Sequence, residues 1–236
     1  MTARNLLLVG ASALALSVGL GLPARADLIT QNLSAGNSAI SGYPAPYDTV
    51  SISRTSSTTA TITFTADHTG SYIYLMGDDG SGAAAVNVNS TNFSVSNITA
   101  SNSGTGFTPG PFTQSSGSMD GFGNFNLSID DFDGYTHSAS TISFNLTDIG
   151  GTWASASDVL AANAGGYDAA THVFVTDYPA DASAMARSTG FAGNGTTPPP
   201  PVPEPGSLGL LGTALVAFGW FRSRKNKKDL AGPAMA

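Results

Sequence analysis

The stretch Thr59-Ala-Thr-Ile-Thr-Phe-Thr-Ala66 decides the fold class of this chain. Its alternation places Ala60, Ile62, Phe64 and Ala66 on one face and four threonines on the other, the period-two pattern of a half-buried β-strand. Seven more runs of this kind lie between Gly, Asn, Asp and Pro residues, at 47–54, 71–76, 84–89, 92–98, 122–130, 139–147 and 171–176. About eight short strands at this spacing predict an all-β body over residues 27–195, either a β-sandwich or a jelly roll.

One short helix is predicted within this body. Trp153, either Ala156 or Ser157, and Leu160 recur at helical spacing between Trp153 and Asn163, and Gly165-Gly166 follows as a stop. The aromatic residues inside the strand runs are expected in the core rather than on a ligand-binding surface. They are Phe64, Tyr72, Tyr74, Phe93, Phe125, Phe144 and Phe174.

Charge divides the chain into three parts. The 236 residues include only 11% charged residues and no cysteine, which excludes disulfides, cysteine metal sites and a cysteine nucleophile. Residues 27–203 hold fourteen Asp, two Arg and neither Lys nor Glu, a formal charge of 2 − 14 = −12. The whole chain has a net charge of −7, which argues against a nucleic-acid partner, since such a protein needs a basic surface.

The first 26 residues have the composition of a secretory signal peptide. A short head with Arg4 precedes the apolar run Leu6–Leu22, Pro23 ends that run, and the small-x-small triplet Ala24-Arg25-Ala26 follows. We therefore expect export by the general secretion machinery and cleavage after Ala26.

The C-terminal end combines three features in a fixed order. Residues 196–205 form a proline-rich linker that ends in Pro203-Glu204-Pro205, and residues 206–221 are apolar. A helix of this length spans roughly 24 Å, which is short for a bilayer. The proline-rich stop before it and the cations after it favour a short membrane helix, with the tail 222–236 in the cytoplasm. The cations of that tail are Arg222, Arg224, Lys225, Lys227 and Lys228.

This ordered combination over residues 202–228 resembles the PEP-CTERM sorting signal of exported proteins from Gram-negative bacteria that make exopolysaccharide. The same segment has also been labelled an ice-binding-protein C-terminal domain. The resemblance implies recognition by an exosortase, a membrane-embedded processing enzyme, with cleavage near Pro203-Glu204-Pro205. It also implies transient anchoring in the inner membrane, followed by delivery to the cell surface or extracellular matrix, as in a biofilm. The tail Asp229–Ala236 departs from the usual pattern, which ends soon after the basic cluster.

No enzyme motif stands out, and we predict no catalytic activity. His68, His137 and His172 each lie near Asp and Ser, but such neighbours arise by composition here, and no G-x-S-x-G elbow is present. The many aspartates single out no carboxylate pair for glycoside hydrolysis. The threonine face of residues 59–65 also suggests ice binding, but that chemistry needs a repeated motif on stacked strands, which the sequence lacks.

Two binding hypotheses remain for the body. Calcium takes oxygen ligands, and Asp130, Asp131 and Asp133 precede Gly134, with a second group at Asp78-Asp79-Gly80. Turns that connect strands are the favoured explanation of both groups, because neither completes a calcium loop with a Glu at its twelfth position. The alternative to a purely sorted surface protein is a carbohydrate-binding module that attaches to exopolysaccharide, through exposed aromatics such as Tyr135 or Tyr167 and with or without calcium.

Overall fold

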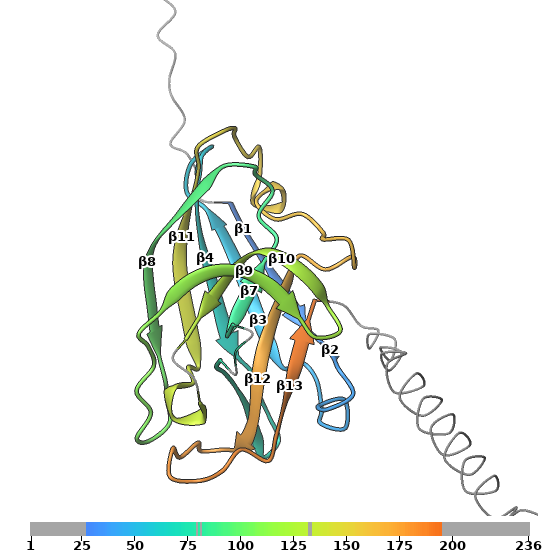
Figure 1. The fold of residues 1–236 in the computed structure, drawn as a ribbon, viewed down its shortest axis with the longest axis vertical. Helices are drawn as coiled ribbons and strands as arrows, with labels where there is room; N and C mark the ends of the chain where they lie inside the picture. The colour runs from blue at the N-terminus through green and yellow to red at the C-terminus, as the bar shows by residue number, and fades with distance from the viewer. Residues whose placement is uncertain (1–26, 79, 81, 132–133, 195–236) are drawn as a thin grey trace, which may run out of the picture.

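The strand β4 (Thr59–Ala66) forms over the residues predicted for it and lies at the centre of the first of two sheets (Figure 1). The computed structural model describes residues 27–78, 80, 82–131 and 134–194. In the first sheet the strand order is β1-β3-β4-β11-β8, and every pair is antiparallel. The other strands of this sheet are β1 (Asp27–Leu33), β3 (Asp48–Arg54), β8 (Phe93–Ser101) and β11 (Thr141–Asp148), of which β3 and β11 pair directly with β4.

The second sheet is organised by β12 (Ala169–Asp177), which pairs with β13 along one side and with β7 and then β6 along the other. Its main path runs β2-β13-β12-β7-β10-β9, and β5 pairs with β6. The remaining strands are β2 (Ala35–Gly36), β5 (His68–Thr69), β6 (Tyr72–Met76), β7 (Ala84–Val86), β9 (Thr113–Met119), β10 (Gly123–Asp130) and β13 (Ser188–Gly193). Figure 1 shows the β9–β10 hairpin arching across the outer face of this sheet.

The two sheets pack face to face, because alternate residues of each contribute to one core. Ile62 and Phe64 of β4 are fully buried and belong to the same cluster as Val173 and Val175 of β12. Full burial of such side chains contributes about 1.5–3 kcal/mol each relative to exposure. The alternation seen in the sequence therefore supplies the main interface between the layers.

The opposite face of β4 carries the threonines, and their hydroxyls bond across the strands. Thr61 Oγ1 donates to Asn145 Oδ1 at 2.9 Å, and the Thr63 and Ser143 hydroxyls lie 2.9 Å apart. These cross-strand contacts stabilise the sheet in the way that is usual for Thr and Ser pairs on an exposed face.

The all-β prediction is confirmed, since each of the eight predicted runs contains an observed strand. The strands β1, β2, β5, β9 and β13 were not predicted. Among the seven aromatics assigned to the core, Tyr72 and Phe93 are only partly buried and pack against its edge. The other five are buried: Phe64, Tyr74, Phe125, Phe144 and Phe174.

The predicted helix over Trp153–Asn163 is wrong. Only a 3₁₀ turn, η2 (Ala156–Asp158), forms there. The segment instead pairs with residues 87–89, through Asn89 N to Val159 O and Ala161 N to Asn87 O, both at 2.9 Å. Trp153 fixes this arrangement, because its ring is buried and its Nε1 donates to Asn89 O at 3.0 Å. Tertiary pairing thus overrides a helical pattern that the Ser, Asp and Asn residues of the segment support weakly.

The predicted end segments lie outside the described residues: the signal peptide 1–26, the linker 196–205, the apolar run 206–221 and the tail 222–236. Among the residues that are described, no helix has the length and apolar character needed to cross a bilayer.

Candidate functional site

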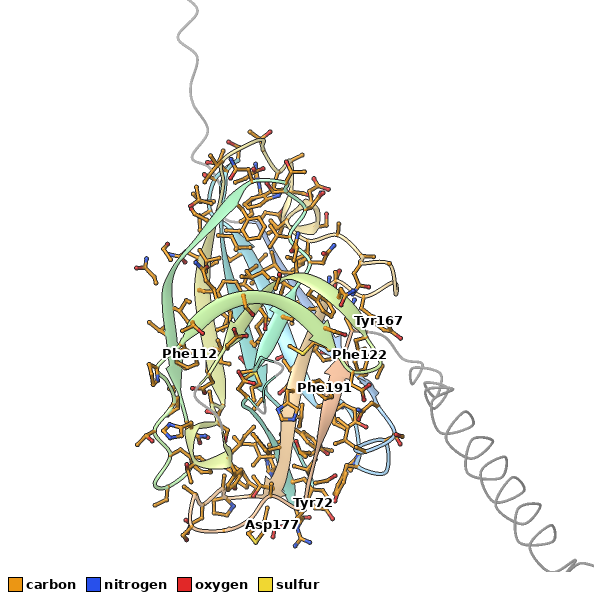
Figure 2. All side chains as sticks on the ribbon, viewed as in Figure 1. Tyr72, Phe112, Phe122, Tyr167, Asp177 and Phe191 are labelled. Carbon is orange, nitrogen blue, oxygen red and sulfur yellow. The ribbon has the colours of Figure 1, made fainter. Side chains whose placement is uncertain are left out.

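Aromatic rings form a row across the outer face of the second sheet. Phe174 and His172 lie on β12 with ring centroids 5.0 Å apart, and His172 lies 4.8 Å from Phe191 of β13. At the other end of the row, Tyr135 of η1 (Tyr135–His137) contacts Phe174 at 5.7 Å and Phe107 at 5.2 Å. Phe191, the last ring of the row, is partly exposed (Figure 2).

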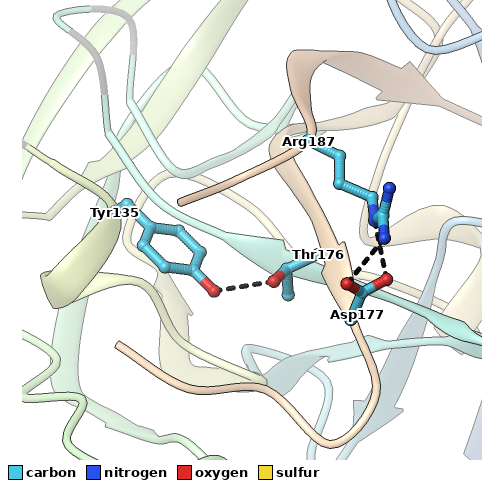
Figure 3. A network of polar contacts seen from close by, with 4 residues as sticks. All are labelled: Tyr135, Thr176, Asp177 and Arg187. Carbon is cyan, nitrogen blue, oxygen red and sulfur yellow. Dashed lines mark hydrogen bonds and ion pairs between the residues drawn. The ribbon is translucent and has the colours of Figure 1, made fainter. Parts of the chain in front are cut away.

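The predicted ligand aromatic Tyr135 is half-buried within this row. Its hydroxyl donates to Thr176 Oγ1 at 2.8 Å, and burial raises the pKa of Tyr135. Beside it, Arg187 donates through Nε and Nη2 to the two carboxylate oxygens of Asp177, at 2.6 and 2.8 Å (Figure 3). The hydroxyl of Tyr135 therefore serves a bond within the fold rather than an open binding surface.

Tyr167, the second predicted ligand aromatic, is also half-buried. Its ring packs edge-on against Phe122 with centroids 4.9 Å apart, in the cluster beneath the β9–β10 hairpin (Figure 2). Phe122 is fully buried there because Gly193 of β13 leaves room for its ring. Tyr167 thus presents only part of its surface to a ligand.

A surface hollow of about 320 Å³ lies beside the exposed end of the ring row. Its floor comes from β12 and β13, and its walls come from the loop after β2 and the turn between β9 and β10. It is lined by Asn37, Ala39, Asp120, His172, Thr189, Gly190 and Phe191. Apart from His172, which was considered for a hydrolase, no sequence pattern singled out these residues, because they come from four separate segments that only the folded sheet brings together.

The polar side chains of this hollow are held by one another and by the backbone. Asn37 Nδ2 donates to Asp120 Oδ2 at 3.1 Å, and Asn37 Oδ1 accepts from the Phe191 N–H at 3.2 Å. His172 Nδ1 lies 2.7 Å from Gly77 O, and Nε2 lies 2.7 Å from Thr189 Oγ1. Because a carbonyl oxygen only accepts, Nδ1 carries the proton, and in the neutral ring Nε2 accepts from the Thr189 hydroxyl. The site is therefore rigid and offers an amide, a carboxylate, a hydroxyl and an aromatic ring.

The residues predicted for calcium are only partly described. Asp133 lies outside the described residues, as does Asp79. Asp130 Oδ1 accepts from Ser128 Oγ at 2.9 Å, and Asp131 Oδ1 accepts from Gly110 N at 2.7 Å. The structure brings Asp130 and Asp78 to one small hollow, although 52 positions separate them. Among the described residues, no group of three or more His, Cys, Asp or Glu side chains has a metal-binding arrangement, so calcium binding stays a prediction.

A carboxylate is buried between the two sheets. Asp48 at the start of β3 is fully buried, and its Oδ2 accepts from Thr171 Oγ1 of β12 at 2.5 Å. Within the described part of the chain, Asp48 Oδ1 and the buried Asp67 Oδ2 have no hydrogen-bond partner. Burial raises the pKa of Asp48 well above its ordinary value; the charge of Asp67 adds to this rise, and the bond from Thr171 opposes it. Burial also raises the pKa of Asp67.

The fold and these sites describe an antiparallel β-sandwich with a polar surface hollow and a carboxylate in its core. A family model described as the PEP-CTERM protein-sorting motif matches residues 201–225, so the chain contains a PEP-CTERM sorting motif. This match includes Pro203, Glu204 and Pro205 and reaches Arg222, Arg224 and Lys225. No curated protein and no solved structure matches the chain. The motif implies processing by an exosortase, export, and a cell-surface or extracellular location.

Proposed function

We propose that this chain is a surface or extracellular-matrix protein that is anchored briefly in the inner membrane and released when an exosortase cuts near Pro203-Glu204-Pro205. The match of residues 201–225 to the PEP-CTERM motif carries this proposal. The sequence predicts an extended backbone at Glu204, because each flanking proline ring fixes its own φ and restricts the residue before it. An extended segment with one defined charge is a suitable substrate for a processing enzyme.

The distribution of charge supports the proposed orientation. Five cations follow the apolar run 206–221 within seven positions, and residues 27–203 contain no lysine. Positive residues next to a membrane segment remain on the cytoplasmic side. The acidic sandwich then lies on the outer side, where cleavage near Glu204 separates it from the apolar run.

We also propose that the sandwich has no catalytic activity of its own. Its histidines have structural contacts that explain their positions: His68 stacks on Tyr178 with centroids 3.8 Å apart, His137 Nδ1 lies 2.8 Å from Thr108 O, and His172 joins β12 to Gly77 and Thr189. A general acid or base needs a ring nitrogen that reaches the substrate. The two ring nitrogens of His172 contact groups of the protein itself.

The test of sorting compares one substitution in the motif with one beyond it. The chain, with an epitope tag in an exposed loop of the sandwich, is expressed in a host with an exosortase. Immunoblots of membrane and outer fractions then measure its mass and location. We expect a shortened form in the outer fraction, and accumulation of the longer form in the inner membrane for Glu204→Ala and in a host without the exosortase.

Asp229→Ala is the matched control, because it removes the one acidic residue after the basic cluster, outside the matched residues 201–225. It should be processed like the unchanged chain. Uncut chain that still carries its C-terminal segment in the outer fraction would show that the proposed sorting route is wrong.

A further inference from the structure

The hollow beside Phe191 has a lining that favours one chemical class of ligand. The ring of Phe191 is partly exposed, Asp120 and Thr189 present an exposed carboxylate and hydroxyl, and the amide of Asn37 is 7% exposed. A volume of about 320 Å³ is at the small end of the range for small-molecule sites, which begins at roughly 300 Å³. This size suits one or two rings of a small ligand.

Charge excludes anionic ligands. The described residues contain two arginines and no lysine, and neither Arg54 nor Arg187 lines the hollow. An anion would meet the carboxylate of Asp120 without any cation to balance it, and like charges at close range repel. Phosphorylated compounds and uronic acids are therefore poor ligands for this site.

Polarity excludes ligands that are wholly apolar. The Asp120 carboxylate accepts one bond from Asn37 Nδ2 and can accept more. An apolar ligand would remove water from these remaining acceptor positions without supplying hydrogen bonds, at a cost of about 1–3 kcal/mol. A ligand with hydroxyl groups on its edges and C–H groups on its faces satisfies both parts of the lining. Neutral sugars have this arrangement.

The side chains are already positioned for such a ligand. Gly190 lets the loop after β2 approach β13, since a Cβ at this position would lie 2.6 Å from Asn37 Oδ1 and 2.9 Å from Ile40 Cγ2. Asn37 pairs with Phe191 through its backbone N–H to Phe191 O at 2.9 Å, besides accepting from the Phe191 N–H. The ring of His172 packs against the ring of Phe191, and His172 itself is 2% exposed. Because these side chains are already held in place, the protein would lose little conformational entropy when a ligand binds, which favours binding.

We propose that this hollow is a binding site for a neutral saccharide, with the sugar ring stacked on Phe191 and its hydroxyls bonded to Asp120, Asn37 and Thr189. The proposal goes beyond sorting and does not depend on it, because it concerns only residues of the sandwich.

The test uses the whole chain, purified in a detergent whose headgroup contains no sugar. Neutral oligosaccharides of glucose, galactose, mannose and xylose are the probes, with a uronic-acid oligosaccharide as the anionic comparison. Saturation-transfer NMR detects binding, and calorimetric titration measures its affinity. We expect at least one neutral oligosaccharide to bind, while the uronic-acid oligosaccharide does not.

Three variants test the site itself. Phe191→Ala should weaken binding about tenfold through the loss of ring contact. Asp120→Asn keeps the shape and should weaken binding several-fold, because hydrogen bonds to a carboxylate are about twice as strong as neutral ones. Phe191→Leu keeps most of the apolar volume of the side chain. If this variant loses affinity while its melting temperature is unchanged, the loss reflects the missing ring and not a change in the fold.

Tyr178→Ala is the matched control. Tyr178 directly follows β12, is 52% exposed and stacks on His68. It does not line the hollow. Its removal should leave the affinity unchanged. The proposal is overturned if no neutral oligosaccharide binds at millimolar concentration, if the anionic probe binds as well, or if folded Phe191→Ala binds with full affinity.

Discussion

The buried carboxylate of Asp48 gives the sandwich a specific dependence of stability on pH. Asp48 lies between the sheets with no exposed surface, and its pKa is raised above its ordinary value, chiefly by burial. Below about pH 4 the group is protonated in both the folded and the unfolded chain. As the pH rises further, the unfolded chain loses this proton while the folded chain keeps it. Unfolding then releases a proton, so the free energy of unfolding falls with rising pH until the folded pKa is passed.

The size of this effect follows from proton linkage. One proton held only by the folded state lowers the free energy of unfolding by about 1.4 kcal/mol per pH unit. Asp67 and Asp168 add slopes of the same sign, because burial raises their pKa values too. The groups that face Asp48 are Thr171, Asp67 and Tyr74, and the pKa of Tyr74 is raised by burial and by charges that include Asp48. Since a tyrosine with a raised pKa stays protonated throughout the acidic and neutral range, Tyr74 does not alter the slope.

Asp48→Asn removes one titrating group and keeps the shape of the side chain. We expect the decline in the free energy of unfolding above pH 4 to become shallower by up to about 1.4 kcal/mol per pH unit. Urea denaturation at half-unit steps from pH 4 to pH 7.5 measures the slope, with Trp153 fluorescence as the signal. A Trp220→Phe background removes the other tryptophan of the chain.

Asp177→Asn is the control, because the pKa of Asp177 is shifted in the opposite direction to that of Asp48. The hydrogen bonds from Arg187 lower the pKa of exposed Asp177. Its contribution is therefore present above the ordinary aspartate pKa and is lost only as the pH falls below about 4. Equal slopes for Asp48→Asn and the unchanged chain between pH 4 and pH 7.5 would refute the reasoning.

Four further predictions concern stability. Thr171→Val removes the bond that lowers the pKa of Asp48, so the fall in the free energy of unfolding should extend to higher pH in the same urea series. Gly193→Ala places a methyl group against the ring of Phe122 and should destabilise the chain by about 1–3 kcal/mol, with partial recovery in a Gly193→Ala/Phe122→Leu double variant in thermal melts. Trp153→Phe removes the donor to Asn89 O and opens a gap in the core, so the free energy of unfolding measured by urea denaturation should fall by about 1–3 kcal/mol. Millimolar calcium should raise the melting temperature modestly if Asp130, Asp131 and Asp133 bind it, and melting curves that are identical in EDTA and in calcium would reject that site.

The features that the sequence predicts well depend on neighbouring residues. Residues 59–66 are a strand because alternate side chains point to opposite faces, and the structure has β4 over the same residues. The strand β9 (Thr113–Met119) was not predicted, because its sequence TQSSGSM shows no apolar alternation and five of its seven residues are exposed. Its pairing with β10, which no local pattern encodes, makes it a strand.

The features that the sequence predicts poorly depend on distant contacts. The spacing of Trp153 to the apolar residues after it is helical, yet its indole binds Asn89, 64 positions away. Tyr135 and Tyr167 were expected as exposed aromatics, yet both are half-buried against other rings, and Phe191, which is half-buried as well, is the aromatic that lines a polar hollow. The one local signal for that hollow is the Gly190-Phe191 pair. It indicates a site only once the loop after β2 is known to pack on Gly190.

The sorting motif and the hollow therefore carry independent kinds of information. The motif is contiguous, residues 201–225, and a processing enzyme reads it as a short segment, so it can be recognised without the fold. The hollow joins residues 37, 120, 172 and 191, none of which lies within the motif, and it exists only in the folded sandwich. Proteins that share the motif thus share a destination without needing to share a ligand. For this chain the proposed saccharide site at Phe191 can therefore be tested independently of substitutions at Glu204.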